Sequence, residues 1–155
     1  MSHPPERVAA VVEAGLLVTR AYFPLRALSE QVLRPVGSST ARMAMLRTLA
    51  HHGPLTVPDI ARMRPVARQG VQRIANEMVR DGYLCWVENP QHKRSRLLAL
   101  TKEGVARYQE LEALQLQWAE RLAARLDPEA VRDASRALRA LRAAFLEALE
   151  EAEGG

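Results

Sequence analysis

The sequence has one cysteine, no long apolar run and no leader pattern. A single cysteine, Cys85, rules out an intramolecular disulfide and suits a reducing compartment. No uninterrupted apolar run reaches the roughly 18 residues that a membrane span needs. The first ten residues, MSHPPERVAA, lack the basic-then-apolar order of a signal peptide. These absences predict a soluble, cytoplasmic protein with no membrane partner.

Motifs for catalysis or metal binding are equally scarce. No Ser/His/Asp set, Gly-rich phosphate loop or carboxylate pair stands out, so we expect neither enzymatic activity nor a cofactor. His51 and His52 are adjacent, and adjacent helical positions do not face one site, so no metal site is predicted. Cys85 lies among apolar residues with no neighbouring base, which favours burial over a redox role.

Positive charge is concentrated in the middle of the chain. The 155 residues have the length of one ordinary domain, and the net charge is only +4. Residues 36–100, however, contain ten Lys or Arg against four acids, a local charge of +6. This distribution predicts a face for a polyanion. The alternative is a composition bias toward arginine.

Apolar periodicity predicts helices in the N-terminal third. The first runs from about 6 to 33, and Pro24 should kink or split it. A second follows a cap at Ser38 or Ser39, turns Met43, Leu46, Leu49 and Ala50 inward, and ends at HHGP.

A helix, a turn, a helix and a hairpin are predicted next. Thr56 and Asp59 have capping-box spacing at the start of the short helix TVPDIARM. Another helix spans about 67–80, and Gly82 stops it. YLCWVE and RLLAL are typical of strands, and the loop NPQHKRS between them is too long for a two-residue turn. This is the order of a winged helix-turn-helix.

Long helices with apolar faces complete the chain. Thr101 caps a helix of about 102–126, and Asp127-Pro128-Glu129 starts another that runs to about 150 with heptad-like spacing. One small domain cannot easily bury such faces alone, so a homodimer is expected. The predicted interface residues are Val8, Val12, Trp118, Leu138, Leu141 and Phe145.

The predicted fold class is mainly α with a small β-hairpin wing. We expect an N-terminal dimerisation helix region at 1–35, a winged helix-turn-helix at 36–101 and C-terminal dimerisation helices at 102–155.

The outer side of the helix at 67–80 carries residues suited to reading bases. A helix fits the major groove, and a cationic hairpin beside it can reach phosphates or the minor groove. A merely solvated face would explain the polarity, but not the choice of Arg, Gln and Asn with one acid, Glu77. Gly70 indicates either close approach to DNA or a helix, or a tolerated imperfection. The predicted DNA contacts are Ser39, Thr56, Arg68, Gln69, Gln72, Arg73, Asn76, His92, Lys93, Arg94 and Arg96.

Residues 42–104 resemble the MarR family of bacterial transcription regulators. The strings that carry the resemblance are RMAMLRTLAHHGPLTVPDIARM, VARQGVQRIANEMVRDGYL and NPQHKRSRLLALTKEG. Asn89 and His92 replace two acids of the family's wing, and Ala67 replaces a usual Ser or Thr cap. The matching positions of the wing motif are Lys93, Arg94, Leu100, Thr101 and Gly104.

The resemblance implies a homodimer that binds a pseudo-palindromic operator in double-stranded DNA, usually as a repressor. Many members release DNA when a small, often phenolic ligand binds. By analogy, a ligand pocket would involve Tyr22, Arg26, Arg47 and His51. Two alternatives remain open: an architectural protein that binds DNA without sequence preference, and a winged-helix adaptor for other proteins.

Overall fold

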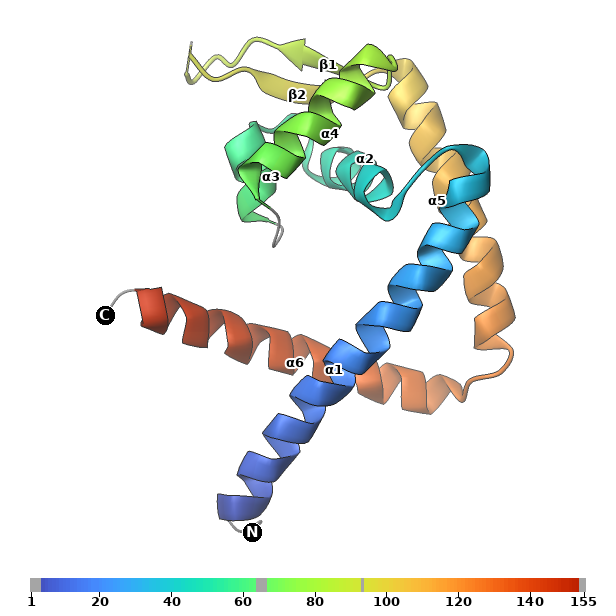
Figure 1. Cartoon of the computed structure of the whole chain (residues 1–155), viewed down its shortest axis with the longest axis vertical. Helices are drawn as coiled ribbons and strands as arrows, with labels where there is room; N and C mark the ends of the chain where they lie inside the picture. Colours follow the sequence, from blue (N-terminus) through green and yellow to red (C-terminus); the bar gives the residue numbers. More distant parts are fainter. Residues whose placement is uncertain (1–3, 64–66, 93, 154–155) are drawn as a thin grey trace. The chain divides into compact units, whose positions relative to one another are not determined.

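The computed structural model describes residues 4–63, 67–92 and 94–153, which are mostly helical with one β-hairpin (Figure 1). This architecture confirms the predicted fold class. The chain divides into two compact units, residues 1–115 and 116–155. In order, the elements are α1 (Pro4–Leu33), the 3-10 turn η1 (Arg34–Val36), α2 (Thr40–His52), α3 (Val57–Arg62), α4 (Arg68–Arg80), β1 (Leu84–Val87), β2 (Leu97–Leu100), α5 (Lys102–Ala123) and α6 (Pro128–Glu153).

The short helices begin at the predicted caps. Ser39 Oγ accepts a hydrogen bond from the Arg42 amide at 3.2 Å and starts α2. Thr56 Oγ1 accepts from the Asp59 amide at 3.2 Å and starts α3. Gly53 ends α2 with a φ of 75°, a conformation that favours glycine. The local sequence signals therefore place these boundaries correctly.

One apolar core holds the first unit together. It joins α2, α3, α4, the hairpin and the first half of α5 through residues such as Leu46, Ile60, Met78, Leu98 and Leu111, each at most 1% exposed. Three of the four residues predicted to face inward from α2 are buried. Ala50 is exposed instead, and Met45 is buried. The broader buried face of α2 reflects packing on several sides, which periodicity alone does not reveal.

The hairpin is anchored to the segment that precedes α3. Its antiparallel strands pair Leu84 with Leu100 and Val87 with Leu97. Leu98 also exchanges two backbone hydrogen bonds with Leu55, at 2.8 and 3.1 Å. The base of the wing is therefore fixed to the helix-turn-helix. Cys85, expected to be buried, is half-buried in β1.

The start of α5 explains why the motif LTKEG ends in glycine. Thr101 Oγ1 donates to the Gly82 carbonyl at 2.7 Å and accepts from the Gly104 amide at 3.0 Å. A Cβ on Gly104 would lie 2.0 Å from the Tyr83 carbonyl oxygen. The start of α5 can approach the residue that precedes β1 this closely only because residue 104 has no side chain.

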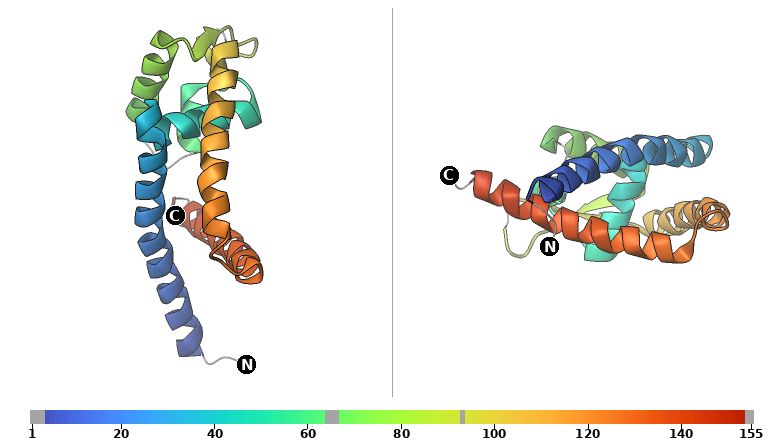
Figure 2. Two further views of the ribbon diagram at one scale, coloured as in Figure 1. Left: turned by 90° about the vertical axis from the view of Figure 1, so that its right-hand side faces the viewer. Right: turned by 90° about the horizontal axis from the view of Figure 1, so that it is seen from below.

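Pro24 is expected to kink or split the first helix; the split is wrong, because α1 continues through this residue (Figure 2). Residues 16–27 are all exposed. The carbonyl that loses its partner at a proline can therefore be solvated, which lowers the cost of keeping the helix. At its far end α1 is tied to α2, since Glu30 accepts hydrogen bonds from the amide and hydroxyl of Thr40.

The expectation that no segment has membrane-spanning character also needs correction. The stretch Pro5–Val36 contains an 18-residue window with a mean hydropathy of 1.5. The window contains charged residues, which interrupt the apolar run, so a search for uninterrupted runs does not find it. The mean hydropathy over 18 residues stays high because at most two of them are charged. By length and composition α1 could cross a membrane, but an apolar helix that is covered by protein passes the same test.

The second unit comprises the end of α5, a turn and α6. α5 ends at Ala123, three residues before the predicted end, and α6 extends to Glu153. Asp127 Oδ2 accepts from the Ala130 amide at 2.9 Å, so the predicted restart is confirmed. Leu138 and Phe145 of α6 are 50% and 41% exposed.

Candidate nucleic-acid interface

The outer face of α4 is a continuous polar surface. Val71, Ala75 and Met78 are buried on the opposite face. Helical spacing places Gln69, Arg73 and Asn76 on one stripe, and all three are exposed. Arg68 is also exposed and Gln72 is partly so. The predicted recognition residues thus avoid the core, as a groove-reading helix requires.

Two contacts hold side chains of this face in place. Gln72 Nε2 donates to Asn76 Oδ1 at 3.0 Å, which aligns two amides along the helix. Arg73 Nη1 lies 2.7 Å from Glu77 Oε1, although the Arg73 side chain is 70% exposed. These polar groups are thus partly paired with one another, and they can exchange these contacts for base or phosphate atoms.

The wing keeps its turn even though one family acid is replaced. Asn89 Oδ1 accepts from the Gln91 amide at 3.0 Å, which is the local bond that an aspartate would also make. Arg96 Nη2 donates to the Trp86 carbonyl at 3.0 Å, across the base of the hairpin. Arg94 and His92 are exposed near the tip. Arg96 thus contributes to the shape of the wing, whereas Arg94 offers its charge to solvent.

The structure brings α4 and the wing together around one hollow of about 270 Å³. Four predicted DNA contacts line it: Arg68 and Gln72 from α4, and Arg94 and Arg96 from the wing. Residues far apart in the sequence therefore form a single basic surface. Such a surface can engage a groove with α4 and the adjacent phosphates with the hairpin.

Two other predicted contacts, Ser39 and Thr56, lie at helix starts and not on the outer face of α4. Ser39 and Thr56 use their hydroxyl groups in the helix caps described above. A contact between these two residues and DNA stays a prediction. Lys93 lies outside the described residues.

Sequence reasoning missed Arg80. It follows Arg73 by seven positions, so it lies on the same stripe of α4, and its side chain is 76% exposed. Helical periodicity predicts this position for Arg80. The residue was overlooked because it is the last of the helix, directly before the Asp81-Gly82 stop.

A separate cleft of about 380 Å³ lies between α1, α2 and α5. Of the four residues proposed by analogy for a ligand pocket, Tyr22, Arg26 and Arg47 line it. His51 is not among the described lining residues and instead makes an edge contact with the Tyr108 ring, 6.4 Å between centroids. A hydrogen bond to Glu112 is the main cause that raises the pKa of Tyr108, with burial next. The cleft presents two guanidinium groups and therefore suits an anion.

Gly70 has open space around it. A Cβ on this residue would meet no heavy atom of the described residues within 4 Å. Close packing against a neighbouring helix, one of the explanations for this glycine, is therefore wrong. Among the described residues, likewise, no group of three or more potential metal ligands comes together.

Comparisons with known proteins point to one family. A model of the MarR family matches residues 37–95. An uncharacterized protein of Mycobacterium tuberculosis is 37% identical over 115 residues, which cover 74% of this chain and 80% of the relative. A transcriptional activatory protein, BadR of Rhodopseudomonas palustris, is 34% identical over 71 residues, 44% of this chain and 41% of that protein.

Solved structures share the fold. A mutant MarR from E. coli complexed with operator DNA matches with a TM-score of 0.74 and 19% identity, over 90% of this chain and 99% of the other. A MarR family protein of Mycobacterium tuberculosis in complex with salicylic acid matches with a TM-score of 0.67 and 26% identity, over 82% of this chain and 94% of the other.

Proposed function

This chain belongs to the MarR family, and from that premise we propose that it is a homodimeric, sequence-specific repressor that a small anionic aromatic ligand releases from DNA. Members of the family are DNA-binding transcription regulators, which confirms the expectation that the chain is not an enzyme. Sequence preference, dimerisation, repression, the ligand and a cytoplasmic location are the proposed parts.

The hollow shared by α4 and the wing carries the proposal for DNA. It gathers Arg68, Gln72, Arg94 and Arg96 on one surface. Arginine can make paired hydrogen bonds to guanine, and glutamine to adenine, so Arg68 and Gln72 supply the means to read sequence. Arg94 supplies charge for the backbone.

The apolar faces of α1 and α6 support a homodimer. Val8 and Val12 of α1 are 65% and 58% exposed, and α6 exposes an apolar series that includes Leu138 and Phe145. A second copy of the chain would cover such faces. It would also explain why α1 is apolar enough to resemble a membrane span. A two-fold dimer places two α4 helices on a pseudo-palindrome with half-sites about 10 bp apart.

Binding-site selection from random duplex DNA tests the proposal. We expect one palindromic consensus, bound at least ~10³-fold more tightly than random duplex. Gln72→Ala should change the selected bases. Arg94→Ala should instead lower the affinity for all duplexes, and it should flatten the slope of log K against log salt by about one unit for each phosphate that the variant no longer binds. Binding without any consensus would instead support the architectural alternative. A complete lack of salt-dependent binding would support the adaptor.

The cleft beside α2 supports the proposed ligand class. Arg26 and Arg47 line it together with the Tyr22 ring, a combination that suits a carboxylate on an aromatic ring. Calorimetric titration with salicylate should detect binding that Arg47→Ala removes. His51→Ala is the matched control, since His51 does not belong to the described lining. A reporter gene under the selected operator then decides between repression and activation.

A further inference from the structure

We propose that Arg42 of α2 is a positioning residue for DNA binding, which retains two acids at the end of α4 and so leaves two arginines of α4 free for the duplex. The acids are Glu77 and Asp81, and the arginines are Arg73 and Arg80. The inference rests on the proposed function, because it concerns how α4 engages DNA.

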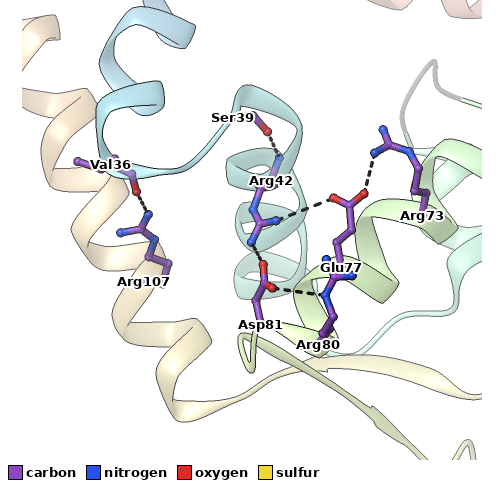
Figure 3. A network of polar contacts seen from close by, with 8 residues as sticks. All are labelled: Val36, Ser39, Arg42, Arg73, Glu77, Arg80, Asp81 and Arg107. Carbon is purple, nitrogen blue, oxygen red and sulfur yellow. Dashed lines mark hydrogen bonds and ion pairs between the residues drawn. The ribbon is translucent and has the colours of Figure 1, made fainter.

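Each acid lies between Arg42 and one arginine of α4 (Figure 3). Glu77 has Arg42 Nη1 at 4.0 Å from Oε2 and Arg73 Nη1 at 2.7 Å from Oε1. Asp81 has Arg42 Nη2 at 2.5 Å from Oδ2 and Arg80 Nε at 3.9 Å from Oδ1. Arg42 is thus the partner that both acids share.

The three arginines differ in how far they are exposed. The Arg42 side chain is only 20% exposed, and its backbone amide is held by the Ser39 cap. The side chains of Arg73 and Arg80 are 70% and 76% exposed. Arg42 is therefore held against Asp81 and lies within ion-pair distance of Glu77. The guanidinium groups of Arg73 and Arg80 can turn outward to a ligand on the polar face of α4.

The negative charge of Glu77 and Asp81 affects how α4 can approach DNA phosphates. The carboxyl end of a helix already carries partial negative charge, and Glu77 and Asp81 add to it close to the face expected to meet phosphates. Without Arg42, the acids would hold Arg73 and Arg80 more strongly and would repel the phosphates at short range. With Arg42 present, each acid keeps a partner when its exposed arginine moves to DNA.

The expected signature is a change in the number of phosphates that the protein binds. Each bound phosphate contributes a slope of about −0.9 to the dependence of log K on log salt. Arg42→Gln should weaken binding to the selected operator and flatten this slope by about one to two units. Adding Glu77→Gln and Asp81→Asn to that variant should restore both the affinity and the slope, because neutral side chains at 77 and 81 no longer hold Arg73 and Arg80. Arg42→Lys, which keeps the charge, should lie between wild type and Arg42→Gln.

Controls separate this role from simpler ones. Arg136→Gln removes the same charge from an exposed ion pair on α6 and should leave the slope unchanged. The double variant Glu77→Gln/Asp81→Asn with Arg42 intact should keep the wild-type slope, and it tests the idea even where Arg42→Gln does not fold. Thermal melts by circular dichroism identify variants that are folded.

The possible outcomes discriminate clearly. A flattened slope that the two acid substitutions restore supports the inference. An unchanged slope in folded Arg42→Gln, or a loss that neutral acids fail to restore, overturns it; the second result would mean that Arg42 itself contacts DNA or acts only through stability. A flattened slope in the acid double variant also overturns it. Wild-type protein that binds no duplex would instead defeat the proposed function.

Discussion

At the residue scale, Gly104 and Arg107 determine how the start of α5 packs against the rest of the first unit. Gly104 allows α5 to approach the carbonyl of Tyr83, and Arg107 donates from α5 to the carbonyl of Val36 in η1 (Figure 3). The same Arg107 guanidinium lies 5.9 Å from the centre of the Tyr83 ring. These contacts depend on atoms at fixed positions, so small changes at these residues should have large effects.

Gly104→Ala should destabilise the protein by about 1–3 kcal/mol, the usual cost of forcing an extra carbon into a packed site. The backbone would have to shift, because the obstacle is the Tyr83 carbonyl rather than a flexible side chain. Urea denaturation measures the change in the free energy of unfolding. A variant as stable as wild type would show that the start of α5 moves without cost.

Asp59 should make stability depend on pH in the acid range. A hydrogen bond from the Thr56 hydroxyl, at 2.5 Å, is the main cause that lowers the pKa of Asp59 below 3.8. A lowered pKa in the folded state means that the stabilisation is present above pH 3.8 and is lost as the pH falls through the folded value. The stability difference between wild type and Asp59→Asn should therefore shrink on acidification. A constant difference from neutral to acid pH would contradict this assignment. The pKa of Glu30 is also lowered, but its contribution to the pH dependence is the same in wild type and Asp59→Asn and therefore cancels from the stability difference.

At the scale of elements, α4 has a packed inner face and a polar outer face, on which Gln72 bonds to Asn76 and Arg73 pairs with Glu77. Its weak points are the start, where Ala67 provides no capping side chain, and Gly70 in the first turns. Both lower the intrinsic stability of the helix at the end that lies beside the wing. The hollow between Arg68 and Arg94 begins at this same end.

Gly70→Ala distinguishes the two remaining explanations for this glycine. Alanine should stabilise the protein by about 1 kcal/mol, since the added carbon has open space and helix propensity improves. If DNA approaches residue 70 closely, affinity for the selected operator should fall although stability rises. Unchanged affinity would mark the glycine as a tolerated imperfection. Melting temperature and fluorescence anisotropy provide the two measurements.

At the scale of the whole molecule, α1 and α6 each expose large apolar side chains. Residues on α1 such as Leu16 and Phe23 are 55% and 63% exposed, and Leu149 of α6 is 58% exposed. A partner copy is the proposed cover for both helices. In that arrangement each monomer contributes one α4 and one wing to the complete DNA-binding surface.

Phe145→Glu should convert the proposed dimer to a monomer, because it introduces a charge into the apolar face of α6. Ala143→Glu is the matched control: Ala143 is exposed, and helical spacing places it on the opposite side of α6. Sedimentation velocity at micromolar concentration measures the result. Dimers that persist in Phe145→Glu, or monomers in Ala143→Glu, would argue against this interface. Wild type that sediments as a monomer and binds lipid vesicles would point to a membrane role for α1 instead.

The sequence by itself determined the local elements and the type of surface. Caps at Ser39 and Thr56, the stop at Gly82 and the two strands follow from interactions within a few residues, which a linear pattern records. The polar face of α4 followed from helical spacing alone. The continuity of α1 through Pro24 did not, because it depends on whether the helix is exposed.

Only the tertiary structure decided which distant residues meet. Arg42 and Asp81 are 39 positions apart, and nothing in their neighbouring sequence indicates a contact. The same is true of the hollow that joins Arg68 to the wing, and of the fit between Gly104 and Tyr83. These pairings are set by how the helices pack around a shared core, and packing depends on shape and burial across the whole unit rather than on any short segment.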